Sequence, residues 1–260
     1  MRRHLRRSIL PAVMALMLTT ALCACQPKTS GLAGADGLTT GTTGPSSFKE
    51  TAALGQAWQA DQKNVGKGLA FASGLGAIGQ TDQQLTVLDQ IYRDHPADAR
   101  VALLYGNTLV KANRAADALP VLERAAASPA ADWHVHNTLA SAYDQQGQFE
   151  RAQSEYAAAI KLQPNQLSVM NNMALSMALH GDLKPAEKLL RTAVALPQAN
   201  SEPRLRQNLA LVVGLQGRYE ESRKIASEDL PPDQVEANLE YLRQMTAQSS
   251  TWQQLSSSKS

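Results

Sequence analysis

The chain has 260 residues, of which 43% are hydrophobic, 5% aromatic and 18% charged, and its formal net charge is +2. This length accommodates a short leader and one folded domain of about 200 residues, and a composition rich in alanine and leucine but poor in aromatic residues suits closely packed helices. The near-neutral charge gives no indication of nucleic acid or anionic lipid as a partner.

Residues 1–24 are predicted to be a secretory signal peptide. Arginines at positions 2, 3, 6 and 7 precede an apolar run over residues 9–21, which is the order of charge and hydrophobicity that such signals have. The run is about 13 residues long, whereas a membrane-spanning helix needs roughly 20, so removal of the segment is favoured over its retention. Loss of the four arginines changes the formal charge from +2 to −2.

The sequence Leu22-Cys23-Ala24-Cys25 resembles the lipobox of bacterial lipoproteins. That resemblance implies signal cleavage after Ala24 and a covalent lipid on Cys25, with no other cofactor. Gln26, which is not Asp, then favours the outer membrane, with the chain facing the periplasm. The alternative is ordinary secretion with a free thiol at Cys25. Cleavage leaves a single cysteine, so no intrachain disulfide is expected.

Two segments precede the main body of the chain. Residues 25–47 are mostly Gly, Thr and Ser with almost no large apolar side chain, a composition typical of a flexible tether. Residues 48–64 carry Leu54 and Trp58 at helical spacing and are predicted to form an N-terminal capping helix.

Residues 65–236 are predicted to form five similar units, each a pair of helices. The same residue types recur with a period of 34 residues, and a two-residue insertion precedes the last unit. The units are 65–98, 99–132, 133–166, 167–200 and 203–236.

Recurring residues within the units define two helices. The eighth residue is small, as two closely crossing helices require; these residues are Ala72, Gly106, Ala140, Ala174 and Ala210. The fifteenth is Gly or Asn, which tolerate the left-handed conformation that ends a helix; these residues are Gly79, Asn113, Gly147, Gly181 and Gly217. Prolines stop the second helix; these are Pro96, Pro129, Pro164, Pro197 and Pro231. This is the pattern of tetratricopeptide repeats, and it predicts an all-α solenoid, a right-handed superhelix of antiparallel helix pairs with helical caps.

The end of the chain is predicted to close the stack. Residues 234–247 place Val235, Leu239 and Leu242 on one side of an amphipathic helix, as a C-terminal cap of a repeat array requires. Residues 248–260 form a polar tail.

No set of residues indicates catalysis. Residues 74–79 have the glycine spacing of a dinucleotide-binding loop, but that motif functions only between a strand and a helix N-terminus. His134 and His136 lie two residues apart, so on a helix they point to different faces, and no third metal ligand has a useful spacing. We therefore predict no enzyme, no metal site and no small-molecule substrate.

The first helix of each unit is predicted to line a concave, protein-binding surface. Its second, fifth, ninth and twelfth residues fall opposite the buried side. From the second unit onward, with the twelfth position taken only in the second and third units, they are Arg100, Leu103, Asn107, Val110, His134, Asn137, Ser141, Asp144, Ser168, Asn171, Leu175, Arg204, Gln207 and Leu211. Amides and hydroxyls there can hydrogen-bond the main chain of a bound segment, and the aliphatic residues can take up its apolar side chains. The alternative is a solvated surface without a ligand.

Several segments resemble one lipoprotein family, TadD of the Tad (tight adherence, Flp pilus) assembly system. They are NLALVVGLQG at Asn208–Gly217, DLPP at Asp229–Pro232, NLEYLRQM at Asn238–Met245, VMNNMALSMALHGDL at Val169–Leu183 and ADW at Ala131–Trp133. The resemblance implies an outer-membrane scaffold that binds proteins of a pilus or secretion complex. It implies the secretin channel as a partner, which this chain would help to assemble as a pilotin-like factor. The alternative is a general envelope scaffold, accessory to cell-wall synthesis or to another secretion system.

Overall fold

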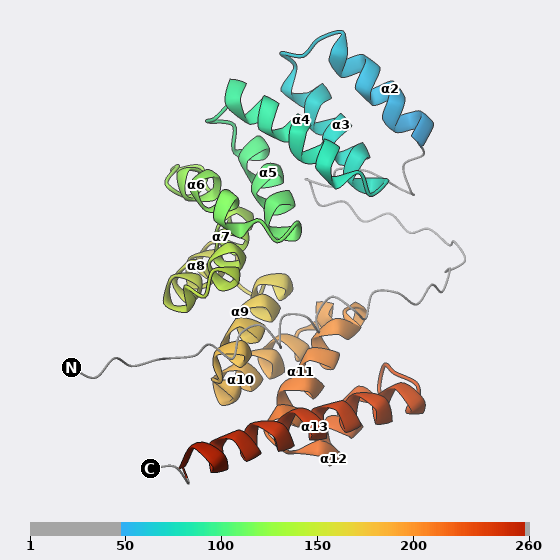
Figure 1. Cartoon of the computed structure of the whole chain (residues 1–260), viewed down its shortest axis with the longest axis vertical. Coiled ribbons are helices and arrows are strands. Elements are labelled where there is room, and N and C mark those ends of the chain that lie inside the picture. Colours follow the sequence, from blue (N-terminus) through green and yellow to red (C-terminus); the bar gives the residue numbers. More distant parts are fainter. Residues whose placement is uncertain (1–47, 258–260) are drawn as a thin grey trace, which may run out of the picture. The chain divides into compact units, whose positions relative to one another are not determined.

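The structure, a computed structural model, describes the backbone of residues 48–257 and the side chains of residues 48–247. This part of the chain is built from α-helices and one short 3₁₀ helix, without strands (Figure 1). The elements are α2 (Phe48–Gln59), α3 (Val65–Ala77), α4 (Thr81–Asp94), α5 (Ala99–Lys111), α6 (Ala115–Ala126), α7 (Trp133–Gln145), α8 (Phe149–Leu162), α9 (Leu167–His180), α10 (Leu183–Val194), η2 (Pro197–Ser201), α11 (Pro203–Leu215), α12 (Tyr219–Ala226) and α13 (Pro232–Ser257). The all-α prediction is confirmed for these residues. The predictions made for residues 1–47, including Ala24 and Cys25, lie outside them.

The odd-numbered helices from α3 to α11 begin at the first residues of the five predicted units. Three of these starts have a visible chemical cause. At α3, Asn64 Oδ1 accepts a hydrogen bond from the backbone N–H of Lys67. Asp98 accepts hydrogen bonds from the backbone N–H groups of Arg100 and Val101, and Asp132 accepts them from His134 and Val135. A carboxylate at this position satisfies N–H groups that have no partner within the helix.

The first helix of every unit ends at a residue in the left-handed conformation. The φ angles are 76° at Gly79, 60° at Asn113, 68° at Gly147, 99° at Gly181 and 79° at Gly217. Glycine and asparagine adopt this conformation at low cost. The chain therefore reverses at the fifteenth residue of each unit.

Small residues let the two helices of a unit pack closely. The eighth residues are all buried, with Ala72, Ala140 and Ala174 fully enclosed. At Gly106 a Cβ atom would lie only 2.5 Å from Leu122 Cδ2 on α6. The second helices supply the facing side of the core with residues that are almost completely buried, namely Leu88, Leu122, Tyr156, Leu190 and Ala226.

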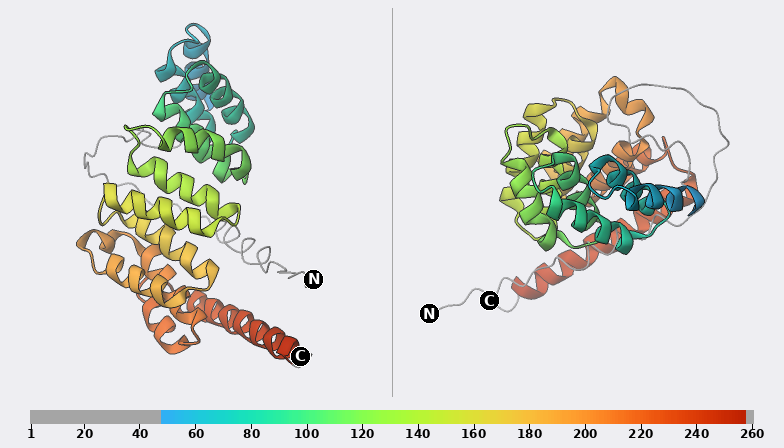
Figure 2. Two further views of the ribbon diagram at one scale, coloured as in Figure 1. Left: turned by 90° about the vertical axis from the view of Figure 1, so that its left-hand side faces the viewer. Right: turned by 90° about the horizontal axis from the view of Figure 1, so that it is seen from above.

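The helix pairs stack in chain order (Figure 2). Each first helix also contacts the first helix of the next unit, as α5 does α7, α7 does α9 and α9 does α11. At the end, α13 buries Val235, Leu239 and Leu242 against the last unit. Within the described range no helix combines the length and the hydrophobicity needed to cross a bilayer.

Three local features of the structure were not predicted from the sequence. Helix α13 continues to Ser257, beyond the predicted end at residue 247, because no glycine or proline interrupts it there. Pro120 lies inside α6, on an exposed surface. Of the two inserted residues, Ser201 ends η2 and Glu202 precedes α11, and η2 holds Ala199 buried between units.

Candidate protein-binding face

The candidate surface is formed by the first helices of four successive units, α5, α7, α9 and α11. We call it the A-helix face, and it comprises the fourteen residues predicted above to line a concave surface. Arg100, Ser168 and Arg204 are exposed. Those that are half-buried are Leu103, Asn107, His134, Asn137, Ser141, Asp144, Asn171, Leu175, Gln207 and Leu211. Val110 is different: it is only 8% exposed and packs in the core, so its assignment as a contact residue is wrong. It lies at a helix crossing, where α7 covers α5.

Amide side chains on this face pair across unit boundaries. Asn172 donates from Nδ2 to Oδ1 of Asn137 at 3.1 Å, and Asn208 donates from Nδ2 to Oδ1 of Asn171 at 2.6 Å. The fifth residue of one unit thus binds the sixth residue of the next. The sequence interpretation had left Asn137 and Asn171 free to hold a ligand and had omitted the sixth position. The amides are instead partly engaged, and only their remaining N–H and C=O groups are available to a partner.

A second polar cluster surrounds Asp144 at the end of α7. Its Oδ1 accepts a hydrogen bond from Ser176 Oγ at 2.7 Å, and its Oδ2 accepts one from Tyr156 OH at 2.9 Å. Gln153 Nε2 donates to Ser176 Oγ at 2.9 Å, and Ser141 Oγ lies 3.3 Å from Tyr156 OH. Burial raises the pKa of Asp144, and it also raises the pKa of Tyr156 well above its ordinary value. This cluster joins α7, α8 and α9.

The charged residues at the edge of the face have different surroundings. Arg100 is paired with Asp98 at 2.7 Å, and this contact lowers the pKa of Asp98. Arg206, on α11, forms a two-pronged pair with Asp229, with bonds of 2.7 and 2.5 Å. Arg204 makes no ion pair with any residue that the structure describes. Of the three arginines, Arg204 is therefore the one available to an external anion.

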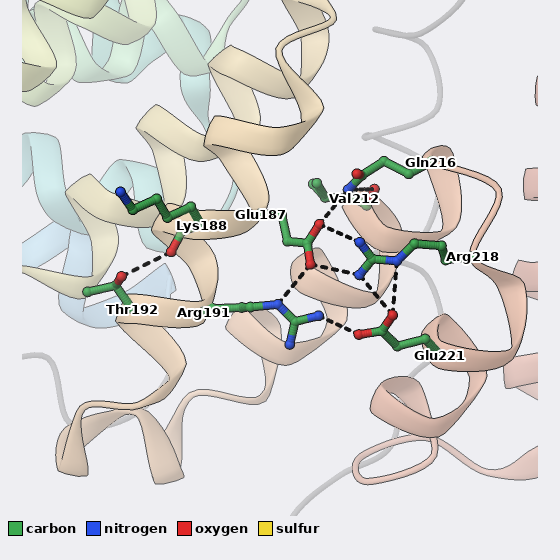
Figure 3. Close-up of polar contacts among 8 residues, drawn as sticks. All are labelled: Glu187, Lys188, Arg191, Thr192, Val212, Gln216, Arg218 and Glu221. Carbon is green, nitrogen blue, oxygen red and sulfur yellow. Dashed lines mark hydrogen bonds and ion pairs between the residues drawn. The ribbon is translucent and has the colours of Figure 1, made fainter.

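A network on the second helices fixes the fourth unit to the fifth (Figure 3). Glu187 of α10 accepts two hydrogen bonds from Arg218, at 2.7 and 2.9 Å, and further ones from Arg191 and Gln216. Glu221 completes the network through contacts with both arginines. The hydrogen bonds from Arg218, more than any other contact, lower the pKa of Glu187 to about 2. Because its members bind one another across the boundary between the two units, this network supports the stack.

The described residues offer no evident place for a metal ion. No group of three or more His, Cys, Asp or Glu side chains converges between residues 48 and 247. His136 binds Glu155 at 2.7 Å, and His134 binds Asp132 at 3.1 Å. The two histidines thus have separate partners.

Comparisons with known proteins agree with this architecture. Two family models, both described as tetratricopeptide repeat, match residues 69–132 and 109–175. Comparison with curated protein sequences found no match.

Several solved structures share the fold. MamA of AMB-1 is 26% identical with a TM-score of 0.50, and the match covers 56% of this chain and 86% of MamA. PilW, described as a widely conserved type IV pilus biogenesis factor, is 18% identical with a TM-score of 0.63, over 69% of this chain and 83% of PilW. YrrB, described as a tetratricopeptide-repeat protein with an unusual peptide-binding site, is 15% identical with a TM-score of 0.53, over 71% of this chain and 96% of YrrB.

The family matches and the helix geometry describe the same units. Helix starts, left-handed ends and small crossing residues recur from α3 to α12, which includes the matched range. Residues 69–175 are therefore tetratricopeptide repeats, and the helix pairs on either side continue the same solenoid fold.

Proposed function

We propose that this chain is a lipid-anchored scaffold of the outer membrane that binds protein segments along its A-helix face. Its partners in this proposal are proteins of a Tad/Flp pilus or of its secretin channel. One observation carries the proposal: four adjacent helices present amides, hydroxyls and aliphatic side chains that remain partly exposed. Tetratricopeptide proteins are typically non-catalytic scaffolds, and a surface of this composition suits recognition of an extended or helical peptide.

The pilus context rests on two weaker supports. The sequence segments that resemble TadD imply it, and PilW, a pilus biogenesis factor, has the same fold. The lipid anchor rests on the lipobox-like sequence that ends at Cys25. A tether over residues 25–47 would allow the repeats to reach partners away from the membrane surface.

Capture from solubilised envelopes tests the binding role. We expect the purified chain to retain pilus or secretin components, identified by mass spectrometry. Leu175→Arg with Leu211→Arg puts two charges on the A-helix face and should abolish capture. Ser154→Arg with Ala157→Arg adds the same charge to exposed positions of α8 and should leave capture unchanged. Equal capture by both double variants would show that another surface binds, and enrichment of cell-wall enzymes would favour the general envelope scaffold.

Fractionation tests the anchor separately. A Cys25→Ala variant has no thiol to acylate, so it should move from the membrane fraction to the soluble periplasmic fraction. Retention of the variant in the membrane fraction would contradict the lipid anchor but would leave the binding role intact.

A further inference from the structure

Asp144 differs from the other acidic residues that are strongly shielded from solvent. The side chains of Glu187 and Asp229 are only 12% and 11% exposed, and arginines bind both of them. Asp144 is half-buried, yet its two oxygens receive hydrogen bonds only from the hydroxyls of Ser176 and Tyr156. Within residues 48–247 no basic side chain forms an ion pair with it. A desolvated carboxylate without a cation is costly, so this site is electrostatically incomplete.

The surroundings of Asp144 suit a long aliphatic side chain. Ser176, which binds the carboxylate, lies on α9 next to Leu175 and one turn before Leu179. Residues three or four apart on a helix are surface neighbours. Leu179 is 51% exposed and Leu175 is half-buried. Along α9, a half-buried and an exposed leucine therefore flank the serine that binds a carboxylate without a counter-charge.

Lysine and arginine have the matching chemistry. Their methylene stems pack along apolar surface while the charged group reaches a polar partner. A cation that reaches a shielded carboxylate forms a charge-assisted hydrogen bond, which is stronger than a neutral one. A hydroxyl or amide ligand would use the same acceptor oxygens but would leave the negative charge uncompensated.

We infer that Asp144 anchors a lysine or arginine side chain of the protein segment that binds the A-helix face. This inference rests on the proposed function and specifies the partner: a segment with one basic residue flanked by apolar ones. Leu175 and Leu179 contact the stem of the basic residue. The remaining hydrogen-bonding groups of Asn137 and Asn172 hold the main chain on one side of it. Burial raises the pKa of Asp144 and so favours its neutral form. A bound cation has the opposite effect and favours the ionised form.

Two labelled peptides test the inference. Both are nonapeptides of alternating leucine and serine with fluorescein at one end, and the central residue is lysine in one and norleucine in the other. In fluorescence anisotropy titrations of the full chain we expect the lysine peptide to bind about tenfold more tightly, as a shielded charge-assisted contact would give. Asp144→Asn keeps an acceptor oxygen for the hydroxyls and should abolish the difference. Asp182→Asn, at an exposed acid, should preserve it.

The outcomes separate this inference from the binding role itself. Equal affinity for the two peptides, or a lysine preference that survives in Asp144→Asn, overturns the role of Asp144 while leaving a functional binding face. Failure of both peptides to bind counts against the binding face and the anchor together. Thermal melts followed by circular dichroism confirm that the variants compared are equally folded.

Discussion

Replacing Gly106 with alanine tests whether small residues at the helix crossings determine the fold. An added Cβ would lie 2.5 Å from Leu122 Cδ2, 2.6 Å from Cγ and 3.0 Å from Cδ1, whereas carbon atoms in contact are normally about 3.5 to 4.0 Å apart. Leu122 is fully buried, so its whole isobutyl group must move within a packed core. Overpacking of this kind costs up to about 3 kcal/mol, and the gain in helix propensity from Gly to Ala is about 1 kcal/mol. We therefore expect Gly106→Ala to lower the free energy of unfolding by about 2 kcal/mol.

Gly66→Ala provides a matched control. Gly66 is an exposed glycine of α3, and a Cβ there would approach only Asn64 Oδ1, at 3.3 Å. The propensity gain should dominate, so this variant should be stabilised by up to about 1 kcal/mol. Urea unfolding followed by circular dichroism measures the free energy of unfolding of the Gly106→Ala and Gly66→Ala variants. In the Gly106→Ala background, Leu122→Val should cost less than it does alone, because it removes part of the clash. A Gly106→Ala protein as stable as Gly66→Ala would refute the close crossing of α5 and α6.

Two other substitutions probe the turns and the charged network. Gly181 has a φ of 99° and no atom within 4 Å of an added Cβ. Gly181→Ala should therefore lower the free energy of unfolding by about 1 kcal/mol through backbone strain alone. An unchanged urea midpoint would contradict this prediction. Glu187→Gln removes a carboxylate whose pKa is lowered from 4.5 to about 2. Because the folded pKa is below the unfolded one, its stabilisation is complete above about pH 4.5 and is lost as the pH falls towards 2. The variant should have a lower urea midpoint at pH 7 and a shallower decline below pH 4.5, and parallel profiles for the two proteins would show that the network contributes little.

The candidate face was only partly predictable from the sequence. The period placed residues such as Leu175 and Gln207 on one side of their helices, because each helix has a fixed number of residues per turn. It did not reveal that Asn137 binds Asn172, 35 residues later, or that Asn171 binds Asn208, 37 residues later. The signal was present: the first separation is one period plus one, and the two-residue insertion accounts for the larger second value. Such a pairing becomes visible only when successive units are aligned with each other, because the two amides belong to different units.

Features that depend on contacts within a few residues were determined by the sequence alone, whereas features that depend on contacts between units were decided by the tertiary structure. Helix starts at Asp98 and Asp132 and helix ends at Gly181 and Gly217 depend on backbone geometry within a few residues, so the sequence alone determined them. Whether a polar side chain is free, paired or desolvated depends on the neighbouring unit. Asp144 was assigned to a protein-binding face, and only the approach of Tyr156 on α8 and Ser176 on α9 determined its hydrogen bonds. Stacking decided its environment because the electrostatic cost of burial depends on everything that surrounds a charge.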